Sequence, residues 1–176
     1  MKERLYKFLN NIGIATHITY DSKSFLNLIR IKDGELLIHP KCTIAHILHE
    51  AGHLAILPGR FRKYANDDLS NVMNKMSNEI DFSNPDSQEA RAFMQTGDCE
   101  ATAWAWSAGK HLNISEKIII SNKNYDKTGA DIRLALSANS YFGINGLSAA
   151  GFCSVRKSSN YRNLPIYPNL IKWIQE

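Results

Sequence analysis

The sequence predicts an α+β fold in one domain that spans residues 1–176. Residues 14–39 are rich in β-branched and aromatic side chains around a turn, whereas most of the chain after them carries apolar residues at helical spacing. Neither a repeat nor a change in composition marks a second domain. A small antiparallel sheet packed on a mostly helical domain is therefore expected.

The first part of the chain should contain the sheet. Apolar residues at steps of three and four predict an amphipathic helix over residues 2–12, and residues 14–20 favour a strand. Residues 25–39 predict a hairpin with Asp33-Gly34 as its turn, because glycine tolerates the positive φ that tight turns need.

The remaining elements should be helical for the most part. A helix is expected from Thr43, a suitable N-cap, to residue 57, because Pro58-Gly59 stops it. A long apolar stripe predicts one continuous helix over residues 86–112. The other expected elements are helices over 69–80, 129–142 and 168–175, and a short buried strand or extended segment at 118–120. Between the last two helices, Gly143, Gly146 and Gly151 should break up the chain.

Composition argues against several classes of protein. The formal net charge is +4, and the basic cluster of Arg60, Arg62 and Lys63 is too small for a nucleic-acid-binding face. The N-terminus lacks the apolar run of a signal peptide. No stretch approaches the length that spans a bilayer, so no membrane partner is expected.

The cysteines indicate the compartment. Cys42, Cys99 and Cys153 are odd in number and widely spaced, and no Cys-x-x-Cys pair occurs. A cysteine-rich structural zinc site is therefore not expected. Free thiols fit a reducing cytoplasm, which is the predicted location.

The strongest chemical signal is the pentapeptide His49-Glu50-Ala51-Gly52-His53, which matches the pattern His-Glu-x-x-His. Residues four apart on a helix lie above one another, so both imidazoles can reach one zinc ion from the same face. Glu50 lies one step along the helix, where it can act as general base toward a water molecule that the metal activates. The predicted cofactor is Zn²⁺.

The helix around this motif has two unlike faces. One face, about 100° wide, is apolar. The opposite face consists of histidine and glutamate, and no Lys, Arg or Asp occurs from Thr43 to Pro58. An ordinary surface helix would carry such charges, so this composition favours a metal in a cleft. The apolar face comprises Ile44, Ile47, Leu48, Ala51 and Ala55, and the polar face comprises His46, His49, Glu50 and His53.

A third metal ligand should come from a later helix. Catalytic zinc takes three protein ligands, and no further histidine follows at a suitable spacing, so a carboxylate is expected. The helix predicted over 86–112 offers Glu100, Asp98 and Glu89. Glu100 and Asp98 lie on opposite flanks of the apolar stripe, each about 80° from its centre. Glu100 is the preferred ligand, because small residues that permit close helix approach follow it, and Asp98 and Glu89 are the alternatives.

Other polar residues could support the ligands or contact a substrate. His46 lies one turn before His49 and is a candidate for either role. Candidate donors to an oxyanion are His46, His111, Arg133, Tyr141 and Tyr161, and the sequence favours none of them. Asp98 is a candidate for a supporting role if Glu100 binds the metal.

The hairpin, the His-Glu-x-x-His helix and a later helix that supplies glutamate together resemble a zincin metallopeptidase of the Glu-ligand (gluzincin) kind, and in particular the ImmA/IrrE family of compact bacterial and phage metallopeptidases. The pentapeptide itself recurs in that family. The resemblance covers roughly residues 14–110, and it implies His49, His53 and Glu100 as ligands and Glu50 as general base. It also implies a cytoplasmic peptidase that often acts on a regulatory protein such as a repressor.

The pentapeptide also resembles that of membrane-anchored ATP-driven proteases, in which an aspartate is the third ligand. Thr96-Gly97-Asp98 is similar to their later motif, and this resemblance favours Asp98. The sequence carries neither their ATP-binding P-loop nor a membrane segment.

The sequence thus predicts a zinc peptidase that acts on a peptide or protein. The alternative is a catalytically inactive metal-binding or regulatory protein on a zincin scaffold, with Arg60-Phe61-Arg62-Lys63 as a contact surface. The intact Glu50 favours the enzyme, because a pure binder needs no general base. Nothing in the sequence indicates an oligomeric state.

Overall fold

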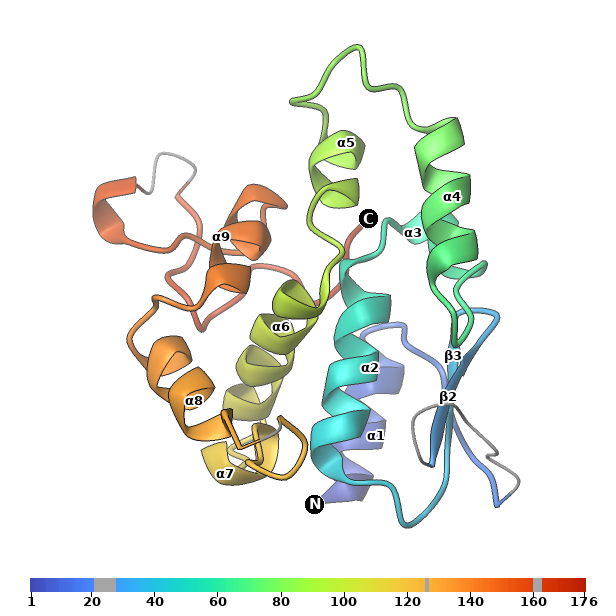
Figure 1. The fold of residues 1–176 in the computed structure, drawn as a ribbon, viewed down its shortest axis with the longest axis vertical. Helices are drawn as coiled ribbons and strands as arrows, with labels where there is room; N and C mark the ends of the chain where they lie inside the picture. Colours follow the sequence, from blue (N-terminus) through green and yellow to red (C-terminus); the bar gives the residue numbers. More distant parts are fainter. Residues whose placement is uncertain (21–27, 126, 160–162) are drawn as a thin grey trace.

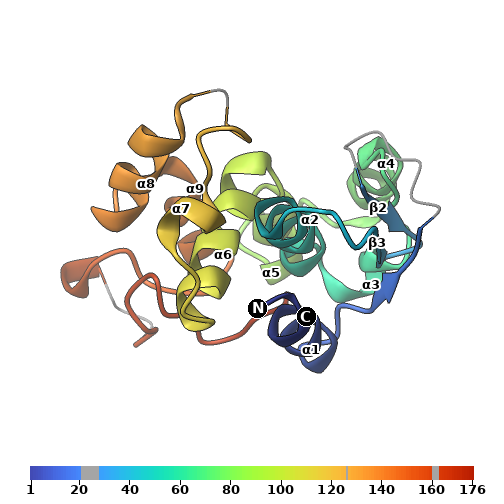
Figure 2. The same cartoon turned by 90° about the horizontal axis from the view of Figure 1, so that it is seen from below.

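The computed structural model describes residues 1–20, 28–125, 127–159 and 163–176, and its fold is α+β as predicted. The helices α2 (Ile44–Ile56) and α6 (Asp98–His111) lie side by side at the centre of the molecule (Figure 1). Seen from below, the small sheet lies on one side of this pair, and the helices that follow α6 lie on the other side (Figure 2). The pair of helices α2 and α6, of which α2 carries the His-Glu-x-x-His motif, is therefore enclosed between the sheet and the helices that follow α6 (Figure 2).

The sheet is mixed, and the prediction of an antiparallel sheet is wrong in this respect. Its strand order is β1 (Thr16–Ile18), β3 (Glu35–Ile38), β2 (Ile29–Lys32), with β1 parallel to β3. The outer edge of β2 is occupied, because the Asp67 carboxylate accepts the Ile31 N–H at 2.8 Å. The strand β1 therefore pairs with the edge of β3 that faces away from β2, and it runs parallel to β3.

The predicted hairpin is confirmed where the structure describes it. Asp33 and Gly34 form the turn between β2 and β3 with φ angles of 51° and 80°. Glycine is required at position 34, because an added Cβ would lie 2.5 Å from the Arg62 carbonyl oxygen. Residues 25–27 of the expected hairpin lie outside the described residues.

The helix α2 forms where the sequence predicts it. Thr43 is the N-cap, and its side chain accepts the His46 N–H at 3.3 Å. The helix is buried on more of its circumference than one apolar face would require, because α6 covers the side opposite the sheet. Its completely buried residues include Ile47, Leu48, Ala51, Leu54 and Ala55.

The continuous helix predicted over residues 86–112 is wrong. The chain forms α5 (Gln88–Phe93), leaves the helical conformation, and starts again as α6. Gly97 is extended, with φ −84° and ψ 172°, and is the N-cap of α6. This break makes Asp98 the first residue of a helix instead of a residue in the middle of one.

Three further predictions need correction. Residues 118–120 belong in part to the helix α7 (Glu116–Ile119), not to a strand. Residues 168–175 are not helical, and this segment packs on α6, where Trp104 Nε1 donates to the Trp173 carbonyl at 2.9 Å. The glycine-containing stretch forms the helix α9 (Phe142–Ala149), because the glycines let it pack against α6.

The other elements agree with the sequence more closely. The helix α1 (Lys2–Asn11) and the helix α4 (Ser70–Glu79) lie where predicted, and α8 (Gly129–Ser137) covers the first part of its predicted range. The helix α3 (Gly59–Arg62) and the 3-10 turn η1 (Lys157–Ser159) are short additions. Within the described parts of the chain, no helix has both the length and the apolar character needed to cross a bilayer.

Candidate metal centre

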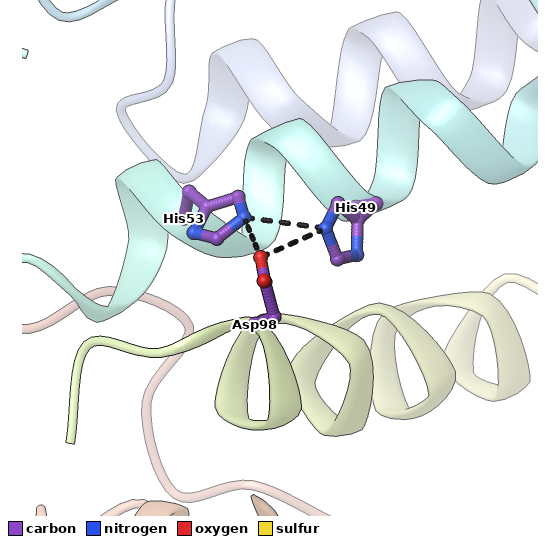
Figure 3. Close-up of side chains that lie close together, drawn as sticks. All are labelled: His49, His53 and Asp98. Atoms are coloured by element: carbon purple, nitrogen blue, oxygen red, sulfur yellow. Dashed lines mark hydrogen bonds and ion pairs between the residues drawn. The ribbon is translucent and has the colours of Figure 1, made fainter. Parts of the chain in front are cut away.

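Two histidines and an aspartate meet between α2 and α6 (Figure 3). The Nε2 atoms of His49 and His53 lie 3.2 Å apart. Oδ1 of Asp98 lies 3.1 Å from Nε2 of His53 and 3.6 Å from Nε2 of His49. Among the residues that the structure describes, these form the one group of three His, Cys, Asp or Glu side chains with the proximity to hold a metal ion.

The three donor atoms have the spacing of a tetrahedral zinc site. With metal–ligand bonds of about 2.0–2.1 Å, two neighbouring donors of a tetrahedron lie about 3.3 Å apart. The three observed separations are 3.1, 3.2 and 3.6 Å. One ion could therefore contact all three donors, and the fourth tetrahedral position would remain open.

One tautomer of His49 would make a cation within this group favourable. Nδ1 of His49 lies 3.3 Å from Oγ1 of Thr102. If Nδ1 carries the proton of a neutral imidazole, Nε2 presents a lone pair toward Oδ1 of Asp98. Two lone pairs that face each other repel, and a cation between them removes the repulsion. Two imidazoles and a carboxylate are also donors that zinc prefers, so the residues fit this metal.

The backbone brings the two helices close enough for this contact. An added Cβ on Gly52, inside the His-Glu-x-x-His motif, would lie 2.5 Å from the carbonyl oxygen of Ala101. The helices run antiparallel, so His53 faces Asp98 while His49 faces Thr102 one turn further along α6. Glycine at position 52 is therefore what lets α6 carry a carboxylate to the histidines.

Asp98 is well placed to be an anionic ligand. The neighbouring imidazoles of His49 and His53 hold its pKa well below the usual range of a carboxyl group, although partial desolvation beside α2 opposes this effect. The position in the first turn of α6 also favours a negative charge, because the helix N-terminus is electropositive. Its side chain is 85% exposed, whereas those of His49 and His53 are 22% and 10% exposed.

Glu50 stands beside the group without joining it. Burial raises the pKa of its carboxyl group, and the charges of Asp98 and Asp67 add to this effect, whereas His49 opposes it. A carboxylate whose pKa is raised is a better proton acceptor. The surroundings of Glu50 thus suit a general base.

Two hollows flank the group of His49, His53 and Asp98, and both are lined by His49, Glu50 and Asp98. The first, which we call the tyrosine-side hollow, has a volume of about 460 Å³. The second, the aspartate-side hollow, has a volume of about 510 Å³. The tyrosine-side hollow is also lined by Ala45, His46, Thr102, Asn124, Tyr125 and Tyr141, and the aspartate-side hollow by His53, Asp67, Asp68 and Leu69. The group therefore lies in the middle of an open cleft.

Glu100, the ligand preferred from the sequence, is not part of the group that the structure brings together. Its carboxylate lies against Gly97 and Gly146, where added Cβ atoms would be 3.0 and 2.3 Å from its oxygens. Burial raises its pKa, and hydrogen bonds from the backbone N–H groups of Glu100 and Gly97 oppose this effect. Two positions along a helix are about 200° apart, so Asp98 faces α2 when Glu100 faces α9. Asp98 takes the place expected for Glu100.

Glu89 also lies elsewhere. Its two carboxylate oxygens accept hydrogen bonds from Nε and Nη2 of Arg60 at 2.6 and 2.8 Å. The second arginine of the basic cluster, Arg62, donates to the carbonyl oxygens of Leu54 and Gln175 at 2.8 Å. Both arginines therefore have partners within the chain.

The two candidate supporting histidines have different positions. His46 lines the tyrosine-side hollow, where burial and the neighbouring His49 lower its pKa. His111 is the last residue of α6, and its ring lies 5.6 Å from that of Phe8 and 4.9 Å from that of Trp173. Fourteen helical residues span about 20 Å, so His111 is far from Asp98 and outside the cleft.

Thr102 and Tyr125 are site residues that the sequence did not reveal. Thr102 lies four positions after Asp98, a spacing that puts both on one face of α6 and could have indicated it. Tyr125 comes from the loop after α7, and no local pattern marks it; its ring lies 6.4 Å from that of His49.

Comparison with protein-family models, curated proteins and solved structures finds no match for this chain.

Proposed function

We propose that this protein is a zinc-dependent peptidase in which His49, His53 and Asp98 hold the metal and Glu50 is the general base. The observation that carries the proposal is the triangle of donor atoms with sides of 3.1–3.6 Å, formed by the two motif histidines and a carboxylate from a different helix. A chance match to the motif would give no reason for a third donor at tetrahedral spacing.

A bound zinc ion supplies a water molecule of lowered pKa and polarises the carbonyl group under attack. Glu50 accepts a proton from that water and passes it to the departing amine. Since the Glu50 carboxylate is partly buried, water does not fully screen its charge, and this favours its function as a base.

The cleft supports a chain-like substrate. The tyrosine-side and aspartate-side hollows meet at His49, Glu50 and Asp98, so a chain laid across the metal would fill one hollow with residues before the cleaved bond and the other with residues after it. A small substrate would need only one hollow. This favours hydrolysis of peptides or proteins over hydrolysis of a small amide.

With Asp98 as the third ligand, the proposal departs from the Glu-ligand zincins. An aspartate ligand fits the resemblance to the peptidase part of ATP-driven proteases better than the resemblance to the ImmA/IrrE family. The shared features are the pentapeptide of α2 and the segment Thr96-Gly97-Asp98.

The test combines metal content with hydrolysis. Wild-type protein and Glu50→Gln are purified without chelators, their metals are measured by elemental analysis, and both are incubated with an unfolded protein and a broad peptide library. We expect about one zinc per chain in both proteins. Only the wild type should cleave at full rate, with the Glu50→Gln rate lower by about 10²–10⁴-fold, which is the usual contribution of a general base.

Each other outcome has a definite meaning. A folded wild-type protein that takes up no zinc even when the ion is added would contradict the metal centre. Zinc bound without turnover of any peptide would instead support the metal-binding or regulatory protein. Equal cleavage by wild type and Glu50→Gln would remove Glu50 from the mechanism.

A further inference from the structure

Thr102 is a buried hydroxyl residue at the back of the metal-binding group. It lies on α6 one turn after Asp98 and is 2% exposed. Its Oγ1 is 3.3 Å from Nδ1 of His49, the ring nitrogen that points away from the other two donors. One face of α6 thus provides a carboxylate to the front of the histidine pair and a hydroxyl to the back of His49.

The hydroxyl is unusual among its neighbours. The residues on either side of Thr102 along α6 are Ala101 and Ala103, so this part of the helix is otherwise small and apolar. Burying a hydroxyl is unfavourable unless it is hydrogen-bonded. A threonine inside a helix commonly bonds back to its own helix, whereas here the hydroxyl reaches an imidazole on α2.

The contact is compatible with the form of His49 that can bind a metal through Nε2. A neutral imidazole has one N–H, and a threonine oxygen that accepts it at Nδ1 leaves the Nε2 lone pair directed at the donor triangle. The Thr102 hydroxyl then has its own proton to donate. Tyr125 and Tyr141 line the same hollow as Thr102. Burial raises the pKa of both phenols, and a hydrogen bond with Thr102 opposes this effect in each. The hydrogen bonds can therefore run from His49 through Thr102 to Tyr125.

The second histidine has no such support. Nδ1 of His53 is buried and has no hydrogen-bond partner among the described residues. The orientation of His53 is instead set by close packing, since its side chain is only 10% exposed. His49 is more open, with 22% of its side chain exposed, and a hydrogen bond restrains it where packing alone would not.

We propose that Thr102 is a positioning residue that holds His49 in the Nδ1-protonated tautomer and in the ring orientation that binds the metal, with Tyr125 as the next member of the hydrogen-bonded chain. The inference rests on the proposed zinc centre. Residues that support a metal-bound histidine in this way typically change metal affinity by about 10–100-fold when they are removed.

Two substitutions separate the hydroxyl from the shape of the side chain. Thr102→Val keeps the branched shape and removes the hydroxyl, whereas Thr102→Ser keeps the hydroxyl and removes a methyl group. Zinc affinity is measured by competition with a chelator of known affinity, so the readout does not depend on catalysis. We expect Thr102→Val to bind zinc about 10–100-fold more weakly and Thr102→Ser to stay within a few-fold of wild type. Tyr125→Phe should have a smaller effect in the same direction.

A second measurement reports the hydrogen bond itself. In zinc-loaded protein, the N–H at Nδ1 of His49 gives a proton signal in nuclear magnetic resonance, and its exchange with solvent is slow when a partner accepts it. We expect slow exchange in wild type and Thr102→Ser, and faster exchange in Thr102→Val. Circular dichroism and thermal unfolding of the zinc-free proteins check that each variant folds.

The outcomes distinguish this inference from the proposed function. Failure of the wild type to bind zinc would overturn the metal centre and with it the role of Thr102 at the metal. Zinc binding of equal strength in wild type and Thr102→Val would overturn the role of Thr102 and leave the metal centre standing. Weaker zinc binding in Thr102→Ser together with wild-type zinc binding in Thr102→Val would assign the effect to packing of the methyl group, which also overturns the role of the hydroxyl.

Discussion

Asp98 and Glu100 are two positions apart, yet their carboxylates have opposite surroundings. Asp98 is exposed at the cleft beside two histidines, whereas Glu100 is 5% exposed and packs where Gly146 leaves room for it. The sequence placed both on flanks of one apolar stripe and could not decide which flank faces α2. That choice depends on which neighbours pack against α6, and neighbours distant in the sequence do not appear in a local pattern.

The two carboxylates should respond differently to neutral substitution. Asp98→Ala removes a ligand, so zinc affinity should fall by more than the roughly 100-fold that the loss of a supporting residue costs at most. Glu100→Gln keeps the buried shape and should retain zinc binding. Zinc affinity of both variants, measured by chelator competition, checks this. The reverse order of effects would restore Glu100 as the ligand.

The cysteines offer a prediction at the same scale. Burial raises the pKa of the Cys42 thiol to about 11 and that of Cys153 to about 12, whereas Cys99 is half-buried at the start of α6. Alkylation requires the thiolate, which is scarce well below the pKa. We therefore expect Cys99 to react first with iodoacetamide at pH 8, and all three to react in denaturant. Mass spectrometry of peptides identifies the modified thiols, and fast reaction of Cys153 in the folded protein would contradict this.

The break between α5 and α6 is the feature of the elements that matters most for the site. The segment Met94–Gly97 interrupts an apolar stripe that looks continuous in the sequence. Glycine inside a helix costs about 1 kcal/mol relative to alanine, and an extended glycine is an acceptable N-cap. The Thr96-Gly97 pair is thus a signal for the start of a new helix, whereas the periodicity of the apolar stripe favours one continuous helix.

The substitution Gly52→Ala should destabilise the protein, although helix propensity alone predicts that it stabilises the helix. Alanine would favour the helix by about 1 kcal/mol, but its Cβ would meet the Ala101 carbonyl oxygen at 2.5 Å. Overpacking costs about 1–3 kcal/mol, and backbone atoms of α6 can yield less than a side chain. We expect Gly52→Ala to lower the free energy of unfolding by up to about 2 kcal/mol and to weaken zinc binding.

Gly109→Ala is the matched control, because its Cβ would meet the side chain of Ile119 rather than backbone. It should destabilise the protein less than Gly52→Ala and leave zinc affinity unchanged. Urea unfolding of both variants gives the comparison. A Gly52→Ala protein as stable as wild type, with wild-type zinc affinity, would show that the close approach of the two helices is not needed.

For the whole molecule, the site joins two helices that are far apart in the sequence. His49 and His53 come from α2 and Asp98 from α6, so an ion bound to all three would link the two central helices.

The α+β class, the hairpin turn and the helix of the motif could be predicted, because each depends on local spacing. The parallel pairing of β1 and the side of α6 that faces α2 could not, because they depend on which segments pack together.

Zinc should therefore stabilise the fold. A ligand at 100 times its dissociation constant adds about 2.7 kcal/mol, which for a domain of this size raises Tm by about 5–10 °C. Differential scanning fluorimetry with added zinc, and then with excess chelator, measures the shift and its reversal. In Asp98→Ala, added zinc should raise Tm by much less than in the wild type. An equal shift in wild type and Asp98→Ala would indicate zinc bound at another place.

The exposure of the Asp98 side chain has a consequence for the kinetics of metal exchange. Two of the three proposed ligands lie on the one helix α2, whereas the side chain of the third, Asp98, is 85% exposed. A competing chelator can displace the carboxylate first while the histidines still hold the ion, so neither unfolding nor separation of the helices is needed for release. The rate of metal loss should therefore rise with chelator concentration. The zinc content of the protein would then follow the supply of the ion in its surroundings on a short timescale.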